Sequence, residues 1–215
     1  HRDLHSFPTR RSSDLAWYDA NDLPYGSSWK APMEWAARQG SAAVVAVVSD
    51  AYPSRPWCRK EATLARTPSP VDRMKQVWTV QPVVSVQRLT KGWSRELPML
   101  AGVPRMGWAD GDGDGEVEEV VDRLLLEALL IGVHRRRAEQ LVARFGRREA
   151  VYVTWTPDVW TLGELAKQLE RRAKAVQEVY YPGATLSSVE RQELGGVLGG
   201  FGKGAQLRTY GEVGP

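Results

Sequence analysis

The sequence predicts an α/β protein with a mostly parallel sheet. Short β-rich runs alternate with helical patterns from residue 17 to the end of the chain, as in folds where helices connect parallel strands. The run Ala42 to Val48 is continuously apolar and valine-rich, which is typical of a central strand covered on both faces. With 215 residues, 42% apolar and 26% charged, the chain can bury one core or two small ones.

The first fifteen residues are polar and unpatterned, and we exclude them from the fold. The segment Ser6 to Leu15, SFPTRRSSDL, resembles the translation of a common sequencing adapter. We therefore expect residues 1–15 to be a non-native leader that replaces the natural start of the protein. His134 is the only histidine after this leader, so serine-, cysteine- and metal-based chemistry that needs histidine would depend on one residue. Carboxylates are the expected source of any chemistry.

Composition excludes several classes of protein. The apolar run at Ala42 is seven residues long, whereas a membrane-spanning helix needs roughly 20, so we expect no membrane partner. The single cysteine, Cys58, cannot form an intrachain disulfide or a multi-thiolate metal site, and we expect a cytoplasmic protein. A net charge of +3 is too small to indicate nucleic acid as a partner.

The residues after the leader divide into elements in a regular order. A strand ends at Trp17 to Asp19, and the loop Asp22 to Gly26 leads through Ser27 or Ser28 into a helix carrying Trp29 and Met33. After the valine-rich strand, the patterns predict a helix from Trp57 to Arg66, a strand from Val77 to Gln87 made irregular by Pro82, and a short strand from Val103 to Trp108.

The segment Asp110 to Gly115, DGDGDG, matches part of a calcium-binding loop. Its twelfth position is Val121, where such a loop requires a bidentate glutamate, so we predict no metal site. A helix over 116–131 follows, with Val117, Val120, Leu124, Ala128 and Ile131 on its buried face, and Gly132 is expected to interrupt it.

The C-terminal part repeats the β/α pattern. Residues 132–149 form an arginine-rich helical linker, for which we favour a solvated surface over a phosphate-binding patch. Residues 150–215 form a second β/α region, with capping boxes at Thr161 with Glu164 and at Ser187 with Glu190, and without a catalytic signature.

One helix carries a candidate catalytic acid. Helical spacing places Trp57, Cys58, Glu61, Leu64 and Ala65 on one face, so Glu61 lies within an apolar stripe. Such a carboxylate is either a surface charge at the margin of the stripe or a half-buried functional acid. The helix begins beyond the carboxyl end of the valine-rich strand, where open α/β sheets bind ligands.

Four motifs carry a family resemblance. W-Y-D (17–19), D-L-P-x-G (22–26), VVAVVSDAY (44–52) and S-R-P-W-C-R-K-E (54–61) are similar in order and spacing to a bacterial Toll/interleukin-1 receptor (TIR) domain. The resemblance implies a flavodoxin-like parallel sheet over 16–131, from which the first strand is missing. Because this strand would occupy the middle of the sheet, we expect the parent protein to be active and this chain to be compromised.

The resemblance also implies an activity. Glu61 corresponds to the catalytic glutamate of TIR domains that cleave the nicotinamide–ribose bond of NAD by hydrolysis or cyclisation, in signalling or antiphage defence. Asp22, Leu23, Tyr25 and Gly26 correspond to a loop that borders the nucleotide site and mediates self-association, and Trp57 could stack on a ring of NAD. NAD would be a substrate rather than a cofactor. The alternative is a non-enzymatic adaptor that acts through other TIR domains.

Overall fold

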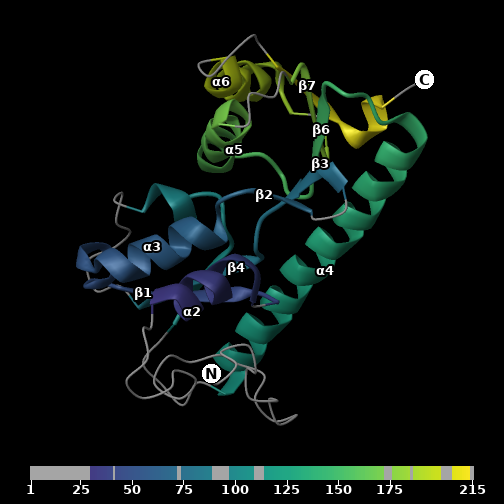
Figure 1. Ribbon diagram of the computed structural model, residues 1–215. Helices are drawn as coiled ribbons and strands as arrows, with labels where there is room; N and C mark the ends of the chain where they lie inside the picture. The colour runs from purple at the N-terminus through teal and green to yellow at the C-terminus, as the bar shows by residue number, and fades with distance from the viewer. Residues whose placement is uncertain are drawn as a thin grey trace, which may run out of the picture.

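The computed structural model describes most of the chain from Lys30 onward. The described residues are 30–40, 42–71, 74–88, 97–108, 114–171, 176–184, 186–199 and 205–213. The strand end expected at Trp17 to Asp19 and the loop Asp22 to Gly26 lie outside these ranges. The described residues form two sheets with helices packed on them (Figure 1).

The first sheet contains the valine-rich strand and confirms the α/β prediction. Its strands β1 (Val44–Ser49), β4 (Val83–Arg88) and β5 (Arg105–Gly107) are parallel and lie in the order β1-β4-β5. Ala46 and Val48 of β1 pack in one core with Ala62 and Ala65 of α3 (Pro56–Ala65). Preceding α3 in the chain are α2 (Lys30–Trp35), the π-helical turn η1 (Ala36–Gly40) and the 3-10 turn η2 (Tyr52–Ser54).

The expectation that both faces of β1 are covered is wrong for the described structure. Among the described strands β1 lies at the edge of its sheet, and the side chains of Val45 and Val47 are 40% and 53% exposed. The long helix α4 (Asp114–Phe145) packs on β4, where Val84 and Val86 on this face are buried, but leaves the neighbouring face of β1 open. An uninterrupted apolar run indicates the capacity for burial on both faces, whereas the neighbouring elements decide whether both are buried.

The single strand expected from Val77 to Gln87 is also wrong, because it is two strands in two different sheets. β3 (Met74–Thr79) belongs to the second sheet and β4 to the first. Pro82 lies between them and has no N–H to donate to a ladder, although its carbonyl accepts from the Val44 N–H at 2.8 Å. The proline thus lies where the chain crosses from one sheet to the other.

The second sheet combines strands from both halves of the chain. Its order is β2-β3-β6-β7-β8, with β2 antiparallel to β3 and the other neighbours parallel. α5 (Val159–Arg171) and α6 (Ser188–Gly199) share a core with one face of this sheet, and the C-terminal half of α4 covers the other (Figure 1). The remaining strand bounds are β2 (Ser69–Val71), β6 (Ala150–Val153), β7 (Glu178–Tyr181) and β8 (Gln206–Thr209), and two further 3-10 turns are η3 (Pro98–Leu100) and η4 (Tyr210–Glu212).

α4 (Asp114–Phe145) runs without interruption along both sheets, so the break expected at Gly132 is wrong (Figure 1). A glycine inside a helix costs about 1 kcal/mol relative to alanine, which the packing of a 32-residue helix outweighs. Of the five residues predicted to be buried, Val120 is buried and Leu124, Ala128 and Ile131 are half-buried. Val117 is 47% exposed, contrary to the prediction.

The start of α5 lies one turn earlier than predicted. Asp158 caps this helix, because its carboxylate accepts from the Thr161 N–H at 3.0 Å while the Asp158 N–H contacts the Thr161 hydroxyl at 3.4 Å. Thr161 is therefore the third residue of the helix, which pairs with the N-cap residue Asp158, and is not itself the N-cap. At α6 the predicted pairing of Ser187 with Glu190 is confirmed.

A buried ion pair joins the two halves of the fold. Arg66, which follows α3, lies 2.5 Å from the carboxylate of Asp158 and donates from Nε to the Met99 carbonyl at 3.3 Å. The side chain of Arg66 is 8% exposed. Trp160, in the first turn of α5, packs against the core of the first sheet. The beginning of α5 therefore contacts both halves.

Three tyrosines cluster beneath α4. From their burial we predict that the free energy of unfolding falls at alkaline pH. The rings of Tyr152 and Tyr180 stack at 5.1 Å, and the Tyr210 hydroxyl donates to the Val153 carbonyl at 2.5 Å. Burial raises the pKa of each of the three phenols above the ordinary value of 10.0.

The sign of this effect follows from proton binding. Below pH 10.0 both the folded and the unfolded chain keep these protons, whereas above it the unfolded chain loses them first. We expect a constant contribution to the free energy of unfolding below this pH and a decline above it. Urea unfolding between neutral pH and pH 11, with a parallel titration of tyrosinate absorbance, measures both quantities. Tyrosinate formation before unfolding would contradict the prediction.

Candidate functional site

The carboxyl ends of the first sheet bring polar and aromatic residues to one edge. Because β1, β4 and β5 are parallel, Ser49, Arg88 and Gly107 end their strands on the same side of the sheet. Ser49 lies opposite Arg88 in the register. Trp108 follows β5, and its backbone N–H donates to the Gln87 carbonyl at 3.0 Å. Open α/β sheets bind ligands at this edge.

α3 starts at the same edge. η2 and Arg55 connect β1 to Pro56, and a proline is favoured at the first position of a helix because its missing N–H would have no helical partner there. Cys58, Ala62 and Ala65 face the core. Glu61 is half-buried and therefore lies at the margin of this apolar face.

Tyr52 lies close to Glu61. Its side chain is buried, and its hydroxyl donates to the Cys58 carbonyl in the first turn of α3 at 3.0 Å. Burial raises the pKa of Tyr52 above its ordinary value, and electrostatic interactions with Cys58 and Glu61 raise it further. Tyr52 therefore stays neutral beside Glu61 and holds the turn that leads into α3.

Trp57 lies one turn before Glu61 and contacts two lysines. Lys60 Nζ is 4.5 Å from the centre of the Trp57 ring and Lys30 Nζ of α2 is 6.0 Å from it, both within the range of cation–π attraction. Lys60 also pairs with Glu34 of α2, and its hydrogen bond lowers the pKa of that carboxyl. Trp57 thus connects α3 with α2, which is the packing role that tryptophans often have at helix starts.

The structure brings together two of the six predicted site residues. Trp57 and Glu61 share α3, whereas Asp22, Leu23, Tyr25 and Gly26 lie outside the described residues. The described ranges hold no group of three or more histidine, cysteine, aspartate or glutamate side chains suited to a metal ion. Asp110 to Gly113 of the calcium-like motif lie outside the described residues, and α4 begins at Asp114.

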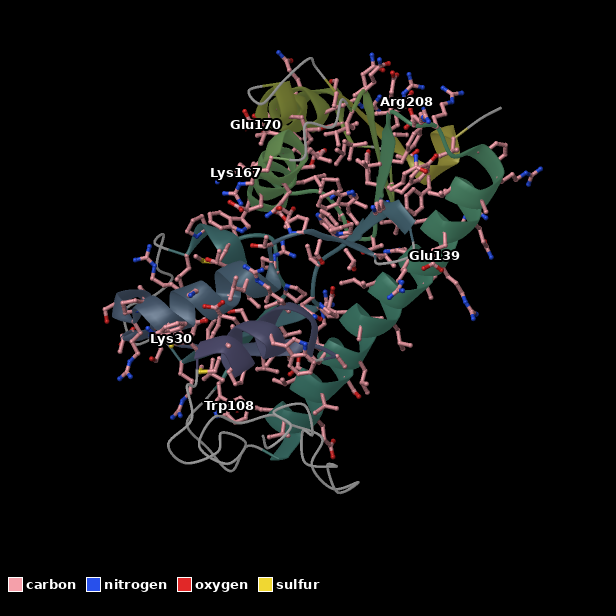
Figure 2. All side chains as sticks on the ribbon, viewed as in Figure 1. Lys30, Trp108, Glu139, Lys167, Glu170 and Arg208 are labelled. Carbon is pink, nitrogen blue, oxygen red and sulfur yellow. The ribbon has the colours of Figure 1, made fainter. Side chains whose placement is uncertain are left out.

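Two open depressions lie on the second sheet, away from Glu61. The larger, about 600 Å³, is at the amino ends of β6, β7 and β8. Glu178 lines this depression, accepts from Arg208 at 3.3 Å and lies 3.7 Å from Arg147. Its carboxylate therefore offsets the positive charge of these two arginines. Figure 2 shows Arg208 at the far end of the molecule from Lys30 and Trp108. The full lining is Arg147, Arg148, Glu149, Gln177, Glu178, Gln206 and Arg208, and the smaller depression, about 410 Å³, includes Arg191, Arg208 and Glu212.

Sequence reasoning assigned no role to three residues at the carboxyl edge. Tyr52 lies three residues after the end of β1, Arg88 ends β4, and Trp108 follows β5. The signal available for each was a polar or aromatic residue at or shortly after the end of an apolar strand.

None of the described helices has the length and apolarity that a membrane crossing requires.

Comparison with known families agrees with this arrangement. A family model of the TIR domain matches residues 10–125, which is more than half of the 215-residue chain. The match includes β1, α3, β4 and β5 and starts inside the segment expected to be a leader. No curated protein and no solved structure shows significant similarity to the chain.

Proposed function

This chain belongs to the TIR-domain family, and on that basis we propose that its parent protein cleaves the bond between nicotinamide and ribose in NAD. The observation that carries the proposal is the position of Glu61, half-buried on the helix that follows a parallel strand at its carboxyl end. A partly buried carboxylate at such an edge is a common form of catalytic acid or charge stabiliser.

A single carboxylate is sufficient for the chemistry of NAD cleavage in this proposal. The C–N bond breaks with its electron pair going to the ring nitrogen, so cationic nicotinamide leaves as a neutral molecule without a general acid. The ribosyl carbon becomes oxocarbenium-like, and water or an adenine nitrogen then captures it, with release of a proton. In this proposal Glu61 orients the ribose hydroxyls and stabilises the developing positive charge.

The NAD-binding residues in this proposal are assigned by resemblance to the family. Asp22, Leu23, Tyr25 and Gly26 would border the nucleotide, and Trp57 would contribute ring contacts. Because Lys60 and Lys30 contact the Trp57 ring, a base that stacks on this ring has to share it with the lysines. We place the activity in the bacterial cytoplasm, in signalling or antiphage defence, with NAD and other TIR domains as partners.

A non-enzymatic adaptor is the second candidate. It is favoured by the apolar surface that the described residues leave exposed, since large exposed apolar patches often mark protein interfaces. In this case TIR–TIR association would transmit the signal without turnover.

Release of nicotinamide distinguishes the two candidates. The purified chain and the parent protein of the proposal are incubated with NAD, and the products are separated by chromatography. Nicotinamide with ADP-ribose indicates hydrolysis, and nicotinamide with cyclic ADP-ribose indicates cyclisation. Intact NAD in both samples, at protein concentrations where both are folded, would favour the adaptor.

A further inference from the structure

α4 carries the largest group of exposed apolar side chains in the described residues. Leu125, Leu129 and Val133 are 56%, 66% and 63% exposed, on a helix whose opposite side packs on both sheets. Single exposed apolar residues are normal, but a continuous apolar stripe on a helix costs free energy in water and usually marks an interface. The complete set on α4 is Val117, Val121, Leu125, Leu126, Leu129, Leu130 and Val133.

The stripe faces away from the rest of the molecule. Val120, Ala138 and Leu141 are the described residues of α4 that are buried, and they mark its inner side. Successive residues of a helix are rotated by 100°. Leu125 and Leu129 therefore lie on the opposite side from these three. Figure 1 shows α4 along one flank of the molecule, running beside both sheets. The described structure thus leaves a long outer face of α4 accessible to a partner.

Positions along this face recur with the spacing of a coiled-coil seam. Residues 118, 122, 125, 129, 132 and 136 alternate in steps of four and three, which keeps them on one line along a helix. In order they are Glu118, Asp122, Leu125, Leu129, Gly132 and Arg136. The line therefore begins acidic, is apolar at its centre and ends basic.

This order is complementary to its own reverse. If two copies of α4 pair antiparallel about a two-fold axis at position 127, Glu118 faces Arg136 of the second copy and Leu125 faces Leu129 of the second copy. Asp122 faces the glycine at 132, where an added Cβ would meet nothing within 4 Å in a single copy. Leu126 lies beside its own counterpart near the axis.

Parallel pairing does not have this complementarity. It would place Glu118 against Glu118 and Arg136 against Arg136, and like charges across a seam are unfavourable. We propose that two copies of this chain associate through the outer face of α4 in an antiparallel, two-fold symmetric pair. The proposal does not depend on NAD cleavage, since it concerns mass in solution and not turnover.

The first test measures mass as a function of protein concentration. Light scattering after size exclusion is expected to show a species of twice the 24.0 kDa chain mass at high concentration, dissociating on dilution. Leu129→Glu should yield only monomer. At concentrations low enough for the wild type to be monomeric, its melting temperature should be unchanged, because the side chain is 66% exposed. Val189→Glu on α6 is the matched control, since Val189 is 62% exposed, and it should retain the dimer.

A charge exchange tests the antiparallel order. Glu118→Arg alone and Arg136→Glu alone each replace two attractive contacts with repulsive ones and should weaken the dimer roughly tenfold. The double variant restores opposite charges in the antiparallel pair and should recover the original affinity. In a parallel pair the wild type, both single variants and the double variant would all place like charges opposite each other, so none of the three variants would weaken the dimer.

Three results would overturn the inference. One is a monomer at every concentration, and another is a dimer that Leu129→Glu leaves intact. The third is failure of the double variant to recover the affinity that the single variants lose. Tyr25→Ala tests the other surface, because a dimer that depends on residues 22–26 would be lost in this variant and retained in Leu129→Glu.

Discussion

Replacing Asp158 with alanine is expected to lower the free energy of unfolding by about 3–5 kcal/mol, the largest stability effect we predict from a single substitution. The change leaves the guanidinium of Arg66 buried without the carboxylate that lies 2.5 Å from it. It also removes the oxygen that accepts from the Thr161 N–H at the start of α5, and the loss of such a cap costs about 1 kcal/mol. Urea unfolding at neutral pH measures the difference.

Two further variants separate the charge from the cap. Asp158→Asn keeps one oxygen that can accept from the Thr161 N–H, but it replaces the second oxygen, which accepts from Arg66, with an NH2 group and removes the negative charge. Because the cap is kept, its loss of stability should be smaller than that of alanine. Adding Arg66→Met to Asp158→Asn removes the uncompensated charge and should recover part of the stability.

The control for Asp158 is an ion pair on α5 whose lysine is exposed and whose glutamate is half-buried. Glu164→Ala breaks the contact with Lys167, whose side chain is 47% exposed, and should change stability by less than about 1 kcal/mol. An Asp158→Ala protein that unfolds at the same urea concentration as the wild type would show that the pair does not connect the two halves.

Replacing Glu61 with glutamine is expected to reduce nicotinamide release from NAD by at least about 10²-fold in the parent protein, with no change in the unfolding transition. Glutamine has the size of glutamate but no negative charge to stabilise a positive ribosyl centre. Because Glu61 lies at the margin of the core, its neutral form should pack as well as the charged one. Initial rates measured with saturating NAD test the effect on the chemical step.

The matched control for Glu61 is a glutamate on another helix. Glu164→Gln on α5 changes a carboxylate whose side chain is 16% exposed and that lies in the other half of the fold, so it should leave the rate within a factor of about two. Equal nicotinamide release by the Glu61→Gln and wild-type proteins would reject Glu61 as the catalytic residue.

The elements around the candidate site were predictable because their signals are local. The valine-rich run from 44 to 48 indicates a strand from any part of the fold, and Pro56 with the apolar spacing after it indicates the start of a helix. Both elements are found where they were predicted. The half-buried position of Glu61 follows from the same spacing, since a residue at the margin of an apolar stripe lies at the margin of the core.

The errors concern features that depend on distant partners. Nothing local distinguishes the β-rich residues before Pro82 from those after it, yet β3 pairs with β6 and β4 pairs with β1. By sequence alone, Thr161 with Glu164 resembles a helix cap as closely as Asp158 with Thr161 does, one turn earlier. The contact of Asp158 with Arg66, 92 residues away, coincides with the true start of α5.

The sequence by itself determined that the valine-rich segment is a strand, that a helix follows it, and that Glu61 lies at the margin of the apolar face of this helix. Those properties follow from side-chain spacing, backbone preferences and caps, all of which act within a few residues. Only the tertiary structure decided which sheet each strand joins, that Gly132 lies inside one continuous helix, and which face of that helix is left uncovered. Hydrogen-bond partners and burial depend on residues far apart in the chain, so their free energies are set when the whole chain packs.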